Sequence, residues 1–395
     1  MIFDHLKPYA GDPILSIMDH YKRDHRAKKV NLSVGLYHDE AGNIPKLKSV
    51  KAAKAFLDAQ ENLGNFYLPI EGSPKYRDLV QNHLFGYISD KSKIVTIQSI
   101  GGSGALRIAA DFMARTYPNS RAWLSSPTWD NHAGIFSSAG FKIMHYPYKS
   151  PDNCSIDFAH LIKTLQSASS YDIIVLHACC HNPTGLDLSL EQWQTIFSIC
   201  GKLKLIPLLD AAYLGLGKGF EHDSKVFKIV ASSGVTALVA NSFSKVFSLY
   251  GERVGSLSVI CTNPELTERV LGQLKLCIRS TYSTPPNFGS ALVCEILSNP
   301  ELYNIWQTEL DSMRSRLHAT RFKLHACLSS EAPNHNHEYL ISQIGMFAYT
   351  NLGRDQVRIL RDRYGIYMLE NGRLCIAGLN DNNLEYVAKS IAEVL

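Results

Sequence analysis

The sequence predicts an α/β protein in which a mainly parallel sheet, flanked by helices, forms a large domain beside a smaller α+β domain. Short apolar runs alternate with helical stretches through the middle of the chain, which is the order of a parallel sheet with crossover helices. The run Asp172–Ala178 is apolar almost throughout, as expected of a strand buried on both faces. Beyond Pro300–Leu328, a long charge-rich helical pattern, only short strand and helix signals follow.

The elements are expected in this order. The strands of the large domain are Lys93–Ser99, Ala122–Leu124, Lys142–Tyr146, Asp172–Ala178, Leu205–Leu209 and Val235–Ala240. Helical patterns between them include Ala105 to about Arg115 and Ser189–Lys202, and the C-terminal signals are Met346–Thr350, Arg354–Tyr364, Arg373–Ala377 and Asn383–Leu395. We expect a large domain over residues 45–310 and a small domain made from both chain ends, residues 1–44 and 311–395.

Composition excludes several classes of function. The formal charge of +4 is small and dispersed, which does not suggest a nucleic-acid partner. No window approaches the roughly 20 apolar residues of a membrane-spanning helix, and the first residues do not form a secretory signal. The nine cysteines follow no metal-binding spacing, so we expect reduced thiols, no metal site and a cytoplasmic protein.

A glycine-rich segment is a candidate for binding a phosphate group, and a lysine motif is a candidate for binding the carbonyl group of a cofactor. Gly101-Gly102-Ser103-Gly104 lies between a strand and a helix, where backbone N–H groups can bind an anion; a plain tight turn is the alternative. Ser242, Ser244 and Lys245 follow another strand, and Arg253 comes soon after. Pyridoxal phosphate (PLP) needs an amine to form its Schiff base, and hydroxyls with a cation for its phosphate. A solvated surface lysine is the alternative.

Two further strands end in polar residues that suit the same cofactor. Asn182, in the turn His181–Gly185, could donate to a ring hydroxyl, and Tyr213 could bond the same group. Asp210 ends an apolar strand where a pyridinium N–H needs an anionic partner. The alternatives are an ordinary turn at Asn182 and a helix N-cap at Asp210. These motifs together favour a PLP site more than each does alone, because they follow successive strands of one chain.

Taken in order, these motifs resemble a known family. S-P-T-W-x-N-H, H-N-P-T-G, D-x-A-Y, S-x-S-K, E-R-V-G and a late G-R resemble the class I aminotransferases of PLP fold type I, over nearly the whole chain. The stretches Tyr9–Leu15, Asn31–Tyr37, Asn241–Gly255 and Pro285–Gly289 resemble the bacterial aromatic-amino-acid (tyrosine) branch more than the aspartate branch. The resemblance implies transfer of the amino group of tyrosine, phenylalanine and aspartate to 2-oxoglutarate by a ping-pong mechanism.

The resemblance also implies a role for each matching residue. Lys245 would hold PLP and act as general acid and base, Asp210 would pair with the ring nitrogen, and Arg373 would clamp the substrate α-carboxylate. The other implied contacts are His132 and His177 behind Asp210; Asn182 and Tyr213 at the ring oxygen; Trp129 on the ring; Gly102, Ser103, Ser242, Ser244 and Arg253 at the phosphate; and Gly35 near the α-carboxylate. Cis peptides are implied at Ser126-Pro127 and Asn182-Pro183.

A homodimer with shared active sites is implied as well. Tyr67 of a second subunit would reach the phosphate, and its Arg279 would meet the side chain of a dicarboxylate substrate. Apolar walls for an aromatic substrate are expected from Val34, Ile14 and Leu15.

Three positions depart from the family pattern and leave substrate preference open. They are Ala212, Leu214 and Glu370, the last being a carboxylate close in sequence to Arg373. We expect Glu370 to point to solvent rather than toward the substrate.

Three alternative functions remain at this stage. One is an aspartate aminotransferase with little aromatic activity, which shares every catalytic residue. Another is a PLP lyase or decarboxylase, against which the paired arginines Arg279 and Arg373 argue. The last is a PLP-sensing regulator, for whose DNA-binding domain we expect no room in this chain.

Overall fold

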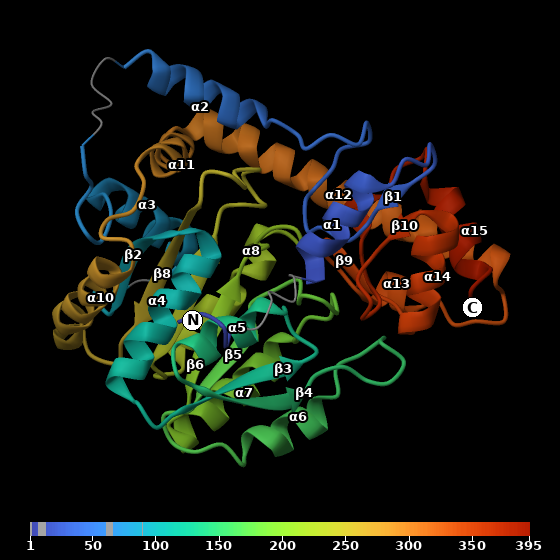
Figure 1. The fold of residues 1–395 in the computed structure, drawn as a ribbon. Coiled ribbons are helices and arrows are strands. Elements are labelled where there is room, and N and C mark those ends of the chain that lie inside the picture. Colours follow the sequence, from blue (N-terminus) through green and yellow to red (C-terminus); the bar gives the residue numbers. More distant parts are fainter. Residues whose placement is uncertain (1, 7–12, 61–65, 89) are drawn as a thin grey trace.

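Seven strands form the central sheet of the computed structural model, which describes residues 2–6, 13–60, 66–88 and 90–395 (Figure 1). Their order is β2-β8-β7-β6-β5-β3-β4. The bounds are β2 Ile94–Ile100, β3 Arg121–Ser126, β4 Lys142–Pro147, β5 Ile173–His177, β6 Ile206–Ala211, β7 Ala237–Ser242 and β8 Val254–Ile260. Strands β3 to β7 run parallel, and β8 is antiparallel to both of its neighbours. The predicted mainly parallel sheet is therefore confirmed.

Helices cover both faces of this sheet because alternate residues of each strand face opposite ways. Ile173 and Val175 pack in one core with α4 (Gly101–Thr116), α5 (Asn131–Ser138) and α10 (Thr267–Thr281). Ile174 and Leu176 pack in the other, larger core. The helices that contribute to that core include α2 Lys48–Asp58, α3 Pro74–Phe85, α6 Phe158–Leu165, α7 Leu190–Leu203, α9 Lys225–Ser232, α11 Phe288–Ser298 and α12 Pro300–Glu331.

Segments from the N-terminal and C-terminal parts of the chain pair beside this layered unit. Strand β1 (Val30–Asn31) pairs in parallel with β10 (Ile366–Tyr367), while β9 (Phe347–Tyr349) pairs antiparallel with β11 (Arg373–Cys375). The remaining elements are α1 Pro13–Arg23, α8 Phe220–Asp223, η1 Pro264–Leu266, α13 Tyr339–Ser342, α14 Arg354–Tyr364, η2 Ile376–Gly378 and α15 Leu384–Ala392. Because α12 runs unbroken through residue 310, the division into domains at that residue stays a prediction.

Two expectations about local structure need correction. The segment Gly101–Gly104 was expected as a loop before a helix, but α4 already begins at Gly101. The positive φ of 73° at Gly101 makes the sharp turn from β2, so the next three residues can be helical at once. Strand β8 was not expected at all. The two implied cis peptides are present, at Ser126-Pro127 and Asn182-Pro183. Within the described ranges, no helix has the length and apolarity needed to cross a membrane.

A buried carboxylate ties together the amino ends of three strands. Asp172, just before β5, accepts hydrogen bonds from the Arg121 backbone N–H and Nε at 2.9 Å each and from Trp123 Nε1 at 2.8 Å. Its backbone oxygen accepts from the Ile206 N–H, at the start of β6. Burial raises the pKa of Asp172, but the Arg121 and Trp123 bonds outweigh burial and leave the pKa below its ordinary value.

Replacing this carboxylate should therefore destabilise the sheet. Asp172→Asn should lower the free energy of unfolding by about 3 kcal/mol, because it removes a buried charge-assisted pair and turns an NH₂ group toward donors. Urea unfolding followed by circular dichroism measures this. Since the folded pKa is depressed, the difference from the unmodified protein should be largest near neutral pH and shrink as pH falls through the folded pKa. Asp58→Asn, at an exposed pair with Lys54, is the matched control and should change stability little. Equal effects of the two substitutions would contradict this account.

Candidate active site

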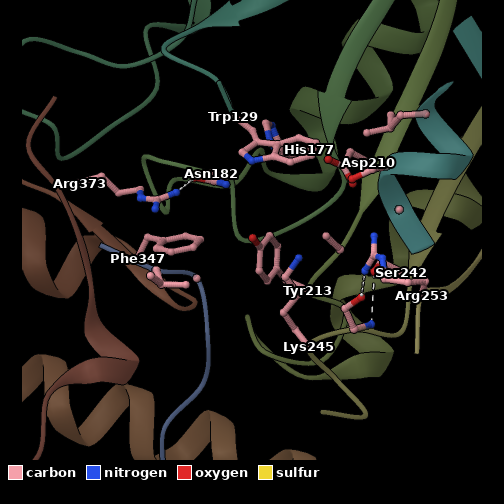
Figure 2. Close-up of a pocket in the computed structure, with 17 residues that line it drawn as sticks. Trp129, His177, Asn182, Asp210, Tyr213, Ser242, Lys245, Arg253, Phe347 and Arg373 are labelled. Atoms are coloured by element: carbon pink, nitrogen blue, oxygen red, sulfur yellow. Dashed lines mark hydrogen bonds between the residues drawn. The ribbon is translucent and has the colours of Figure 1, made fainter. Parts of the chain in front are cut away.

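A cavity of about 220 Å³ opens where β5, β6 and β7 end, the edge at which open α/β sheets bind ligands (Figure 2). His177, Asp210 and Ser242 lie at or near the last residues of these three strands, and Gly102 and Ser103 lie in the first turn of α4. The side chains that line the cavity come from segments far apart in the sequence: Val34, Gly35, Gly102, Ser103, Leu106, Trp129, His177, Asn182, Asp210, Ala212, Tyr213, Ser242, Ser244, Lys245, Arg253, Phe347 and Arg373.

One end of the cavity is built to bind an anion. Arg253 Nη1 donates to Ser244 Oγ at 3.4 Å and to the Tyr250 carbonyl at 3.2 Å, and Ser242 Oγ accepts from the Ser244 N–H at 3.3 Å. Gly102 and Ser103, in the first turn of α4, line the same cavity, and the first N–H groups of a helix have no partner within it. A Cβ atom at Gly101 would lie 2.7 Å from Arg253 Nη2, so only glycine leaves room for the guanidinium.

The opposite wall carries a buried acid. Asp210 Oδ2 lies 3.1 Å from His132 Nε2, and His132 Nδ1 lies 2.8 Å from Thr128 Oγ1. Burial raises the pKa of Asp210, but the hydrogen bond and nearby charges, including Lys245, hold it below the ordinary value. The carboxylate therefore stays ionised at neutral pH and is suited to pair with a protonated nitrogen. His177, beside it, is buried, and neither of its ring nitrogens has a partner among the described residues.

Lys245 lies between these two ends, in the turn that follows β7. Its Nζ lies 5.2 Å from the centroid of the Tyr213 ring (Figure 2). Burial lowers its pKa; the Asp210 carboxylate opposes this effect, and the cations of Arg253 and Arg373 add to it. The amine therefore becomes a neutral nucleophile at lower pH than an ordinary lysine.

A buried arginine closes the third side. Arg373 donates from Nη1 to Asn182 Oδ1 at 3.2 Å and from Nη2 to the Ser33 carbonyl at 2.6 Å, while its Nε has no partner among the described residues. Its guanidinium carbon lies 4.3 Å from the centroid of the Phe347 ring. Burial lowers the pKa of Arg373, and the two acceptors of its hydrogen bonds are neutral, so its guanidinium can bind a carboxylate ligand.

Most of the predicted site residues meet in this one cavity. Lys245, Asp210, Tyr213, Gly35, Gly102, Ser103, Trp129, Asn182, Ser242, Ser244, Arg253 and Arg373 all line it, as does the expected apolar wall Val34. His132 lies behind Asp210, as expected. Tyr67 and Arg279 do not line it: Tyr67 is 89% exposed, and Arg279 is exposed and bonded to Ser283. The side chains of Ile14 and Leu15, and residues 9–12 of the stretch Tyr9–Leu15, lie outside the described residues.

The three unusual positions are now placed. Glu370 turns away from the cavity and pairs with Arg354 and Arg358 of α14, at 3.2 Å each. Glu370 is not among the residues that line the cavity, and it is held by arginines rather than free in solvent. Ala212 lines the cavity, and Leu214 is buried in the larger core.

Sequence reasoning missed two residues of the cavity, Leu106 and Phe347. Leu106 lies one turn into α4, on the face that packs against the sheet. Phe347 is carried in by β9, which pairs with β11 so that Cys375 lies opposite it. The sequence predicts a strand at Met346–Thr350, which contains Phe347, but it does not predict that this strand pairs with β11.

Comparison with known proteins decides the family. The family model described as aminotransferase class I and II matches residues 27–391. The chain belongs to the class I and II aminotransferases. It is 47% identical to the aromatic-amino-acid aminotransferase of Escherichia coli K12 and 39% identical to the aspartate aminotransferase of the same strain, each alignment covering all of both chains. The structure of the aromatic-amino-acid aminotransferase of Burkholderia pseudomallei, covalently bound to pyridoxal phosphate, superposes with a TM-score of 0.96, at 41% identity and with both chains fully covered.

The charges around Lys245 of this aminotransferase predict its titration. In protein freed of bound ligands, the Lys245 amine should titrate below the ordinary value of 10.5. Asp210→Asn should lower that pKa further, because an anion that stabilises the ammonium is lost, and Arg373→Leu should raise it, because a cation is lost. The pH dependence of Lys245 acetylation, followed by peptide mass spectrometry with exposed lysines as reference, measures both shifts. Shifts of the opposite sign would show that these charges do not act on the amine.

Proposed function

We propose that this chain is a PLP-dependent aminotransferase that moves the amino group of aromatic amino acids and aspartate to 2-oxoglutarate. The observation that carries the proposal is the position of Lys245, whose amine lies between an ionised acid, Asp210, and an anion-binding end built around Arg253. The arginine Arg373, with only neutral acceptors, gives the same cavity a place for a carboxylate.

The residues present fit PLP. Its phosphate suits Arg253, Ser242, Ser244 and the first turn of α4, where the cradle at Gly101 leaves no space for a side chain. Its ring nitrogen suits Asp210, and its aldehyde suits the amine of Lys245. When bound, PLP withdraws electrons from the substrate Cα and carries the amino group from one substrate to the next.

The protein's own groups then have distinct tasks. Arg373 binds and orients the α-carboxylate of the amino acid with Asn182, beside Gly35. Lys245 would hold the cofactor when no substrate is bound, and its free amine would take the proton from the substrate Cα and later return it as general acid. Asp210, backed by His132, keeps the proton on the ring nitrogen.

Ring contacts complete the proposal. Tyr213, Asn182 and Trp129 line the cavity from loops that follow strands (Figure 2). Tyr213 and Asn182 would contact the ring oxygen, and Trp129 would lie on the ring face. Burial raises the pKa of Tyr213 well above its ordinary value, so its phenol stays protonated and can donate a hydrogen bond.

We further propose that the active protein is a cytoplasmic homodimer with shared sites. Tyr67 and Arg279 lie outside the cavity of their own chain, and both are exposed. An exposed tyrosine beside an exposed Phe66 suits a subunit interface, where aromatic residues are enriched. In the dimer, Tyr67 and Arg279 of one copy would complete the cavity of the other. The cytoplasmic location is supported by nine free cysteines, as expected in a reducing compartment.

Replacement of Lys245 tests the chemistry directly. Lys245→Ala should lose the covalently attached cofactor, seen as loss of the visible absorption band that amino donors otherwise bleach, and nearly all transamination. Lys218→Ala, a lysine outside the cavity, is the matched control and should keep both. Unchanged rates in Lys245→Ala would overturn the proposed function.

Replacement of Arg279 tests the substrate range. Arg279→Leu should cut kcat/KM for aspartate by at least ~10²-fold while sparing phenylalanine within about tenfold, because a charge-assisted contact is removed from only one substrate. Steady-state assays with 2-oxoglutarate as acceptor measure both. Equal losses, or no turnover of phenylalanine by the unmodified enzyme, would favour a narrow aspartate aminotransferase instead.

Mixing two inactive variants tests the shared site. A Lys245→Ala chain and an Arg279→Asp chain, each inactive on aspartate, should regain activity when mixed, because one cavity of the mixed dimer carries neither substitution. The measurement is aspartate turnover, with heterodimers verified by native mass spectrometry. Verified heterodimers without activity would contradict the shared site and leave the Lys245 result standing.

A further inference from the structure

A second cavity lies at the edge of the sheet opposite Lys245, and we propose that it binds a small aromatic carboxylate. Its volume is about 450 Å³, larger than the cavity at Lys245. The volume is in the range of small-molecule sites. Neither the residues that line it nor the space inside it are used by the proposed transamination.

The second cavity is lined by residues at the amino ends of β6 and β7. The carboxyl ends of the same strands line the active site. Ile206, the first residue of β6, lines it, and Asp210 of the same strand lines the active site. On β7, Leu238 lines the second cavity and Ser242 the first. Its outer walls are the last turns of α4 and α7 and the start of α10. The two cavities are therefore separate and share no lining residue.

The walls of the second cavity favour an aromatic ligand. Its interior is apolar, with Phe112, Leu238 and Val259 belonging to the core on the α4 face of the sheet. At one side, the rings of Tyr117 and Tyr171 stack at 4.5 Å with an interplanar angle of 6°. A flat ring can slide between this pair and the apolar residues with favourable dispersion contacts, and aromatic walls favour such a ring over a flexible chain.

The charges at the cavity favour a carboxylate on that ligand. Arg269 of α10 and Lys204, just after α7, both line the cavity and are exposed. No aspartate or glutamate is among the lining residues, and in the described part of the chain neither cation forms an ion pair. An unpaired guanidinium beside an apolar cavity matches a molecule with one anionic end and one apolar end. A cation or a wholly apolar molecule would not use this arrangement.

The proposal is tested by calorimetric titration of the full chain with 4-phenylbutyrate. Because an aromatic carboxylate can also enter the active site, binding is assigned by variants that touch only the second cavity. Val270→Trp places an indole inside it from α10, and Thr236→Phe fills it from the other side. We expect each to remove one class of binding sites per chain and to leave transamination within about twofold, since neither residue lines the active site.

Charge recognition is tested separately, at an exposed residue whose loss should not affect folding. Arg269→Gln should weaken 4-phenylbutyrate binding to this class of sites at least about fivefold, and Arg115→Gln, which removes a nearby arginine outside the cavity, should leave it unchanged. The affinity for 4-phenylbutanol, which lacks the carboxylate, should be the same in Arg269→Gln as in the unmodified protein.

Three results would overturn the proposal. The first is the same number of sites in Val270→Trp and Thr236→Phe as in the unmodified protein, with folding verified by circular dichroism. The second is an Arg269→Gln protein that binds 4-phenylbutyrate as tightly as the unmodified one, which would show that Arg269 does not recognise the carboxylate. The third is an equal loss of affinity for 4-phenylbutyrate in Arg269→Gln and Arg115→Gln, which would show that only the overall charge of the protein matters. None of these results depends on whether the chain transaminates.

Discussion

The parallel register of β5, β6 and β7 is the constraint on which the site depends. His177 lies opposite Asp210, and Ala211 lies opposite Asn241, so the three strands end together. His177, Asp210 and Ser242 also share one face of the sheet with Ile173 and Val175, the face on which α4 packs. This is why the first turn of α4 can meet their side chains. A slip of one residue in β6 would turn the Asp210 carboxylate into the opposite core, where it would be an unpaired buried charge.

Charge balance in the cavity then decides which ligands it accepts. Lys245, Arg253 and Arg373 line it against a single carboxylate, Asp210. The cations outnumber the carboxylate, and burial of Lys245 and Arg373 makes that excess costly unless a ligand brings negative charge. The cavity can bind anions at two places. The places differ in kind. Arg253 is exposed and works with serine hydroxyls and backbone N–H groups, which suits a phosphate, whereas the buried fork of Arg373 suits a carboxylate.

The sequence predicted the polar side of the site well because polar residues directly follow apolar strands there. Asp210 and Lys245 could be found in this way without any tertiary information. Phe347 could not, because its place depends on how β9 pairs with β11 and on the packing of Gly35, whose Cβ would lie 2.8 Å from the ring. Tyr67 and Arg279 are exposed and do not line the cavity of their own chain, so their part in a shared site stays a prediction. The domain boundary and the roles of individual residues stay predictions.

Strand β8 shows the same limit in the fold. Val254–Ile260 is buried at every position, yet its sequence VGSLSVI contains one glycine and two serines and does not predict a buried strand. Ser258 is accommodated because its Oγ lies 2.9 Å from Thr96 Oγ1 of β2, and Gly255 because a Cβ there would lie 2.5 Å from the Asn241 carbonyl of β7. A Cβ atom at Gly255 would also lie 2.8 Å from the backbone of Gly101, so Gly255 lies close to the start of α4 as well. The small residues of β8 thus let β7, which carries Ser242, and the start of α4 come close together. The same glycine and serines that keep β8 from being predicted as a buried strand therefore allow the anion-binding end of the cavity to form.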